Sequence, residues 1–331
     1  MNERIVYIDW LRIVAAFMVV IIHTSGMLYM DCPKGPSEYY LGFWSGELVR
    51  SAVPIFFMIS GALLLRPGYD ASPKKMVRKA LKVLALMLIW SFVYAILTLH
   101  PFESHELSIK GVIFSTIKGP FHFWFFEILI GLYLLTPVFK AITEYKEGVI
   151  VKYYIALFVL FGIIISSLQS IPYCHKWIMD VTSKISVEWL GFAGYFFLGH
   201  YLDQKRYVVS TWGVILIFIG AVLLQGFVFT NMGLLYSSDK FWWLTIVEAS
   251  ALFVLFANCQ LLRTAGEGVK LWSSFAMGVY IIHPFILEHI PMNWWNASLY
   301  GVDVLLVYGG ALALSYIIMK IPIAGKWLLS I

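Results

Sequence analysis

Long apolar runs recur along this chain and restrict what it can fold into. Ten of them are long enough to cross a bilayer, which takes about 20 helical residues, and they lie at roughly 8–30, 43–65, 80–99, 121–139, 153–171, 187–202, 208–229, 241–262, 272–290 and 303–321. Only 13% of the residues are charged, whereas about a quarter are charged in ordinary soluble domains. We therefore expect an all-α, polytopic membrane protein with about ten transmembrane helices. Residues 1–331 should form one membrane-embedded domain with no soluble domain.

The loops between these runs differ in charge. The side that carries the termini, with its span ends, holds 17 of the 24 Lys and Arg residues. Cytoplasmic loops are enriched in these residues, so both termini are predicted to be cytoplasmic. The first run is too long for the core of a signal peptide and lacks a small-residue cleavage site, so we interpret it as a retained span. Because the basic residues follow topology, we expect no nucleic-acid partner.

The three cysteines show neither metal-site spacing nor a dense disulfide framework. Cys32 and Cys174 fall on predicted outer loops and could form a disulfide in an oxidising compartment. No metal site is expected.

Arg12 and His23 lie eleven residues apart in the first apolar run. At about 100° and 1.5 Å per residue, both side chains leave the same face of a helix, roughly 16 Å apart. Asp9 precedes Arg12 at i,i+3 spacing, where the two can pair. Charged groups in a span are costly and commonly functional. An imidazole can take a proton from a hydroxyl near neutral pH. The alternative role for His23 is structural, a hydrogen bond to a neighbouring helix. For Arg12, phosphate or carboxylate binding competes with a role as an interface anchor.

A basic segment precedes the third run. Ser72-Pro73 is typical of a helix start, and Lys74, Lys75, Arg78, Lys79 and Lys82 then recur on one face, with Arg66 nearby. This segment can bind the phosphates of a nucleotide-like donor, or set topology and contact anionic lipids. In the second run, Pro54 precedes the small Ser60-Gly61 pair, which is typical of close helix packing.

Other polar residues fall inside the predicted spans. Arg50 needs an acid or a ligand there, and Glu127 or Glu248 could supply the acid. His283 precedes Pro284, so it can support a kink or a site. His122 and the neighbouring Trp124 are ordinary components of an interfacial aromatic belt.

Four segments occur in an order that resembles a known family. They are the Arg12–His23 pair, Pro54 to Gly61 (PIFFMISG), His122 to Pro137 (HFWFFEILIGLYLLTP) and Gly278 to Pro284 (GVYIIHP). Together they resemble acyltransferase family 3, the bacterial integral-membrane O-acyltransferases. The layout is most similar to single-domain members that O-acetylate a cell-envelope glycan.

The resemblance implies ten helices, cytoplasmic acetyl-CoA as acyl donor, and transfer to a sugar hydroxyl of a glycan or lipid-linked sugar in the bacterial inner membrane. The family's essential arginine and histidine carry over to Arg12 and His23. We expect His23 to act as the base, with Arg12 and Asp9 in the same site. An acyl-enzyme formed on His23 is the alternative that the sequence leaves open. The further assignments are donor binding by Arg12, Ser60, Arg66, Lys74, Lys75 and Arg78, and acceptor binding or support by Arg50, Glu127, Glu248 and His283.

Two other functions fit parts of the sequence. Buried Arg, His and Glu residues suit a proton-coupled secondary transporter, although paired Gly/Pro-interrupted spans in corresponding halves are not visible. A non-catalytic sensor or uptake module of the same fold is the other, but it would not need both Arg12 and His23. Coenzyme A and membrane lipids are the remaining expected partners, and the chain can form a homo-oligomer.

Overall fold

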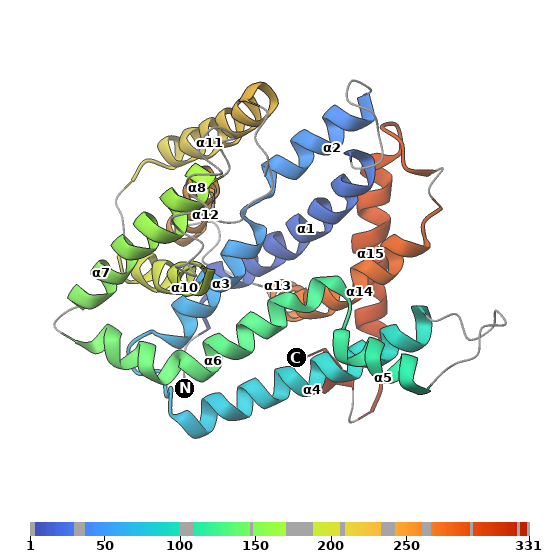
Figure 1. Ribbon diagram of the computed structural model, residues 1–331, viewed down its shortest axis with the longest axis horizontal. Coiled ribbons are helices and arrows are strands. Elements are labelled where there is room, and N and C mark those ends of the chain that lie inside the picture. Colours follow the sequence, from blue (N-terminus) through green and yellow to red (C-terminus); the bar gives the residue numbers. More distant parts are fainter. Residues whose placement is uncertain are drawn as a thin grey trace.

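The described residues of the protein form helices and no strands (Figure 1). The computed structural model describes residues 4–29, 37–98, 109–145, 148–169, 188–205, 209–232, 242–259, 266–291, 294–322 and 325–329. Its helices are α1 (Val6–Tyr29), α2 (Ser37–Leu48), α3 (Ala52–Leu64), α4 (Pro73–Thr98), α5 (Ile109–Lys118), η1 (Phe121–Phe123), α6 (Trp124–Glu144), α7 (Val149–Leu157), η3 (Phe158–Ile164), α8 (Ile165–Gln169), α10 (Glu188–Gln204), α11 (Thr211–Met232), α12 (Trp243–Asn258), α13 (Glu267–Ser274), α14 (Ala276–His289), α15 (Tyr300–Met319) and α16 (Gly325–Leu328). The all-α fold class is confirmed.

Seven helical segments are long and apolar enough to cross a membrane, or eight if the bent pair α13–α14 is one span. Two further expected spans coincide with α10 and α12. These helices have only 17 and 16 residues, fewer than the roughly 20 that a straight span needs. The protein is therefore a multi-pass membrane protein, while the count of ten and the cytoplasmic termini stay predictions.

Two of the expected spans are interrupted. Residues 43–65 were expected as one helix, but α2 and α3 are separated at residues 49–51. Pro54 accounts for this break, because a proline has no N–H for the carbonyl four residues earlier and its ring clashes with it. The expected span at 272–290 bends by 52° between α13 and α14. Its Pro284, by contrast, lies inside α14.

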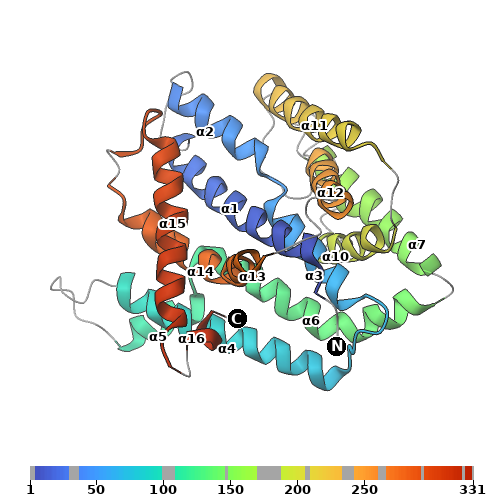
Figure 2. The same cartoon turned by 180° about the vertical axis from the view of Figure 1, so that it is seen from behind.

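The first helix lies at the centre of the bundle (Figures 1 and 2). It packs against α2, α3, α12, α13, α14 and α15. Elsewhere in the bundle α3 packs closely on α10, and α4 lies along α6. Polar residues along α1 therefore face other helices of the bundle.

Glycines bring α3 and α10 into backbone contact. A Cβ at Gly61 would lie 1.7 Å from the carbonyl oxygen of Phe196, and a Cβ at Gly199 would lie 2.1 Å from that of Met58. The close packing predicted for the Ser60-Gly61 pair is confirmed for Gly61.

Candidate functional site

Asp9 is a buried acid near the start of α1 and organises the basic groups around it. Its carboxylate accepts a hydrogen bond from Arg4 Nε at 2.5 Å and another from Ser273 Oγ at 2.8 Å. Arg12 Nη1 lies 3.7 Å from Asp9 Oδ1, which confirms the i,i+3 pair. A buried carboxylate needs such partners, because an unpaired charge is costly away from water. Asp9 therefore fixes Arg4 and the half-buried Arg12 on one side of the bundle.

A polar cavity of about 630 Å³ opens beside these residues. It lies between α1, α3, α4, α6, α13 and α14. Four cationic side chains line it, Arg4, Arg12, Lys79 and Lys82, and the wall also includes Ser60. The acid that balances part of this charge, Asp9, is buried behind the arginines. The cavity therefore presents a concentration of positive charge suited to phosphate groups.

The residues to which we assigned donor binding lie in different places relative to this cavity, and their role stays a prediction. Arg12 and Ser60 line the cavity, whereas Arg66, Lys74, Lys75 and Arg78 do not. Lys74 and Arg78 are exposed on α4. Lys79 and Lys82, which share the basic segment, occupy the face of α4 that reaches the cavity.

Lys75 is engaged elsewhere, at the loop before α4. Its Nζ lies 3.7 Å from Asp70 Oδ2 and 4.5 Å from the centre of the Tyr69 ring. The backbone N–H of Ser72 donates to Asp70 Oδ1 at 3.0 Å and lowers the pKa of that carboxyl. Asp70 is thus an anionic partner for Lys75 and fixes the entry into α4.

Three histidines gather at the other end of the polar stripe of α1. The ring of His23 lies 5.1 Å from that of His283 on α14, and the ring of His122 in η1 lies 5.9 Å from that of His283. His283 Nδ1 donates to Val279 O at 2.9 Å, which leaves Nε2 as the acceptor of a neutral imidazole. Neither His283 Nε2 nor the ring nitrogens of His122 have a hydrogen-bond partner among the described residues. The cluster therefore has unused hydrogen-bonding capacity beside His23.

Tyr280 joins the cavity to the histidines. Its side chain lines the cavity, while its hydroxyl donates to the backbone carbonyl of His122. Its ring lies 5.7 Å from that of His122 and 6.1 Å from that of His283. The basic cavity and the histidine cluster thus meet at one side chain.

Three residues that we assigned to acceptor binding or support lie outside the histidine cluster. Arg50 belongs to a separate cluster, whereas Glu127 and Glu248 make no contact of the kind expected with it. Arg50 Nε donates to Glu47 Oε1 at 2.9 Å, so the expected partners, Glu127 and Glu248, are not the ones it uses. The other oxygen of Glu47 accepts from Gln225 Nε2 on α11 at 2.8 Å. Glu127 is exposed on α6. Glu248 is fully buried on α12, and neither of its carboxylate oxygens has a hydrogen-bond partner in the described part of the chain.

Sequence reasoning did not assign Glu47 and His122 to a site, and it also missed Gln225, Arg4 and Tyr280. Glu47 could have been found, because it stands at i,i+3 from Arg50 at the edge of the same expected span. His122 opens one of the four segments that carry the family resemblance. It was not assigned to the site because it stands in an aromatic run that is typical of a membrane interface.

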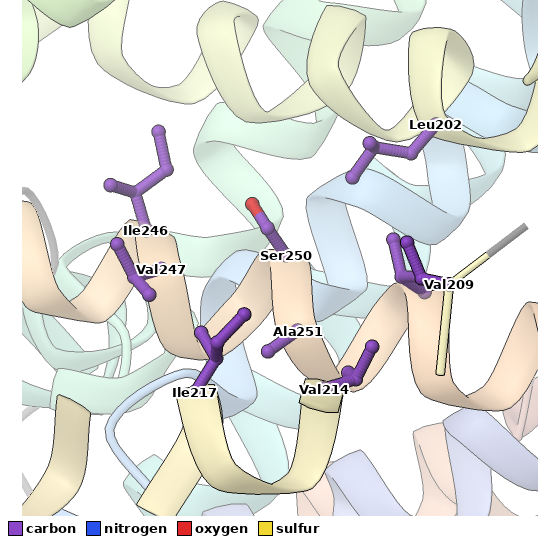
Figure 3. Close-up of a pocket in the computed structure, with 9 residues that line it drawn as sticks. Leu202, Val209, Val214, Ile217, Ile246, Val247, Ser250 and Ala251 are labelled. Atoms are coloured by element: carbon purple, nitrogen blue, oxygen red, sulfur yellow. The ribbon is translucent and has the colours of Figure 1, made fainter. Parts of the chain in front are cut away.

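An apolar cavity of about 510 Å³ lies between α10, α11 and α12. Figure 3 shows aliphatic side chains around it, including Leu202 and Ile217, and the hydroxyl of Ser250. Its walls carry no titratable side chain. This cavity suits a hydrocarbon chain and cannot supply acid–base chemistry.

Within the described ranges no group of three or more His, Cys, Asp and Glu side chains could hold a metal ion. Cys259 is a free, half-buried thiol. The predicted pair, Cys32 and Cys174, lies outside the described residues.

Comparison with known proteins gives one match. The model of acyltransferase family 3, described as an acyltransferase domain, matches residues 5–320. No curated protein and no solved structure matches the chain. The family match extends from Ile5, just before α1, to Lys320, the residue after α15. It therefore includes Tyr280, the histidine cluster and the residues of the basic cavity except Arg4.

Proposed function

We propose that this chain, which belongs to acyltransferase family 3 and is a membrane acyltransferase, moves an acetyl group from cytoplasmic acetyl-CoA to a sugar hydroxyl of a cell-envelope glycan or glycolipid in the bacterial inner membrane. One observation carries the proposal. A cavity with four cationic side chains ends at Tyr280, which also touches the histidines beside His23. Such an arrangement provides for a polyanionic donor at one end and for base chemistry at the other.

The cationic end of the cavity accounts for donor binding. Phosphate groups bind well to arginine forks and to lysines in partly buried sites. Arg12 is oriented by Asp9, and Lys79 and Lys82 add point charges from α4. The other basic residues that we assigned to the donor would attract a polyanion toward this end, because clustered charge raises the local concentration of an oppositely charged ligand. These residues are Arg66, Lys74, Lys75 and Arg78.

The histidine end accounts for the chemistry. His23 takes the proton of the acceptor hydroxyl as its oxygen bonds to the thioester carbonyl carbon. The carbon–sulfur bond then breaks, and the proton passes from His23 to the departing thiolate of coenzyme A. In the alternative with an acyl-enzyme, a ring nitrogen of His23 bonds to the carbonyl carbon, the carbon–sulfur bond breaks, and the N–H proton of the ring passes to the thiolate. The acceptor oxygen then bonds to the acyl carbon, the bond to His23 breaks, and the hydroxyl proton ends on the released imidazole. His283 lies close enough to His23 to orient it, because their ring centres are 5.1 Å apart.

The test is transfer of radiolabelled acetyl from acetyl-CoA by membranes that contain the protein, with lipid-linked sugars and a cell-envelope extract as acceptors. We expect label in a glycan fraction, and its loss in His23→Ala and Arg12→Ala at equal protein level. Label that persists in His23→Ala would exclude His23 as the base and leave the reaction class intact.

Matched lysine variants test the donor site. If the cavity holds the phosphates, Lys79→Gln should raise the KM for acetyl-CoA more than Lys74→Gln, since both are on α4 and only Lys79 lines the cavity. Equal effects would assign donor binding to the whole basic segment. No transfer with any acceptor, together with no binding of acetyl-CoA to the purified protein, would favour the proton-coupled transporter or the non-catalytic module.

A further inference from the structure

An exposed aromatic ring packs against His23 at the outside of the protein. The Phe121 ring meets that of His23 edge-on, with 5.4 Å between the centres, while 61% of Phe121 is exposed. His23 itself is partly exposed. A route to His23 that passes Phe121 is therefore much shorter than the route through the basic cavity, which begins about three helical turns away along α1 at Arg12.

The surface next to Phe121 is apolar where a water-facing helix would be polar. On α5 the exposed face carries Ile109, Phe114 and Ile117, which are 78%, 69% and 74% exposed. The less exposed residues are small or β-branched, namely Gly111, Val112, Ser115 and Thr116. A helix whose most exposed side chains are large and apolar has lipid as its solvent along that face. Phe121 is exposed and follows α5 after Gly119 and Pro120 alone, so it continues this apolar surface along the chain.

Behind Phe121 the site has unused polar groups. Phe121 also contacts His122, with 5.3 Å between the ring centres. The ring nitrogens of His122 and Nε2 of His283 are buried without a hydrogen-bond partner among the described residues. Leaving such groups unpaired is costly, and the cost is recovered when a ligand with hydroxyl groups binds.

Two lysines bracket the apolar face of α5. Lys110 and Lys118 are both exposed on it, and Lys118 lies three residues before Phe121. A cation at the edge of a lipid-facing surface complements the phosphate that links a sugar to its lipid carrier. The surface thus offers hydrocarbon contact, a positive charge and, behind Phe121, hydrogen-bonding groups for a sugar.

We infer that Phe121 gates a lateral entrance through which a phosphate-linked, lipid-borne sugar reaches His23 from the bilayer, with His122 and His283 binding the sugar hydroxyls. The inference rests on the proposed function and specifies its acceptor. Phe121 is a positioning residue here, because it admits the acceptor and then covers it, and takes no part in proton transfer.

Accessibility of position 121 tests the entrance without any turnover. A nitroxide spin label is attached to Phe121→Cys, in a chain whose Cys32, Cys174 and Cys259 are replaced by serine, and the protein is placed in lipid nanodiscs. We expect relaxation by oxygen, which concentrates in hydrocarbon, to exceed relaxation by a water-soluble nickel chelate. The reverse order would overturn the lateral entrance even if acyl transfer is confirmed, so the two failures are distinguishable.

Kinetics test the acceptor class. We expect acetylation of a lipid-linked sugar to exceed that of the same sugar freed from its lipid by at least roughly tenfold at equal concentration, because confinement to the bilayer raises effective concentration. Phe121→Ala should change the KM for the lipid-linked acceptor several-fold and leave the KM for acetyl-CoA unaltered. Phe92→Ala is the matched control, since Phe92 on α4 is also exposed and should alter neither KM. Equal rates for the two acceptors, or equal effects of the two variants, would refute the gate.

Discussion

Gly61→Ala tests how the cavity wall is held in place. The added Cβ would stand 1.7 Å from the carbonyl oxygen and 2.6 Å from the carbonyl carbon of Phe196. Real Cβ contacts essentially never fall under 3.0 Å, so α10 must withdraw from α3 by about 1.3 Å. The obstacle is backbone, which cannot rotate away as a side chain can. Overpacking of this kind costs typically 1–3 kcal/mol, and we expect the upper end, because Gly199 brings α10 equally close to Met58 O.

Thermal unfolding in detergent, followed by size-exclusion chromatography, measures this cost. At about 2–4 °C per kcal/mol for chains of this order of size, a loss of about 3 kcal/mol lowers Tm by roughly 6–12 °C. Gly131→Ala is the control, because Gly131 lies within α6 and a Cβ there meets nothing within 4 Å. That variant should match the wild type or gain up to about 1 kcal/mol from helix propensity. If Gly61→Ala melts as Gly131→Ala does, the backbone contact between α3 and α10 is wrong.

Three further substitutions follow from buried polar contacts. Asp9→Asn removes the charge that pairs with Arg12 and accepts the hydrogen bond from Arg4 Nε. The KM for acetyl-CoA should therefore rise about tenfold, the scale of one charge-assisted hydrogen bond, and unchanged donor kinetics would contradict this. Arg50→Met leaves Glu47 buried without its cation, so the free energy of unfolding should fall by about 3–5 kcal/mol. A Tm equal to that of the wild type would exclude an ion pair that is shielded from water. Lys140→Met removes the Nζ that donates to the first two carbonyls after α3, those of Leu65 and Arg66, at 3.1 and 2.7 Å. A loss of about 1–3 kcal/mol is therefore expected in the same assay.

The features that the sequence predicted are those fixed by helical periodicity. Residues three or eleven apart on one helix share a face whatever surrounds them, so the Asp9–Arg12 pair and the polar stripe of α1 were predictable. The apolar runs likewise had to become helices, because a bilayer offers no partner to an unpaired backbone group. The break at residues 49–51 was signalled by Pro54, although the run was apolar enough to be taken as one helix.

Contacts between helices were beyond the sequence. Lys74, Arg78, Lys79 and Lys82 are equally basic, and which of them reaches the cavity depends on how α4 rests against α6. Likewise, His122 joins the histidine cluster only because η1 is packed beside α14. Such contacts depend on the relative placement of whole helices, which neither hydropathy nor spacing encodes.

The position of Tyr280 bears on how one site could serve two substrates that arrive from different directions. Under the proposed function, the donor occupies a polar cavity with charged walls, and the acceptor occupies a lipid-facing site behind Phe121. Tyr280 stands between them with its ring among the histidines and its hydroxyl bonded to the backbone of His122. Because only the Tyr280 ring lies between the two sites, a thioester in the cavity is close to His23. The same ring limits the water that could compete with the sugar hydroxyl for the acyl group. The two buried clusters then have different tasks: the histidines meet the substrates, whereas Glu47 and Arg50 secure the broken segment between α2 and α3 against α11.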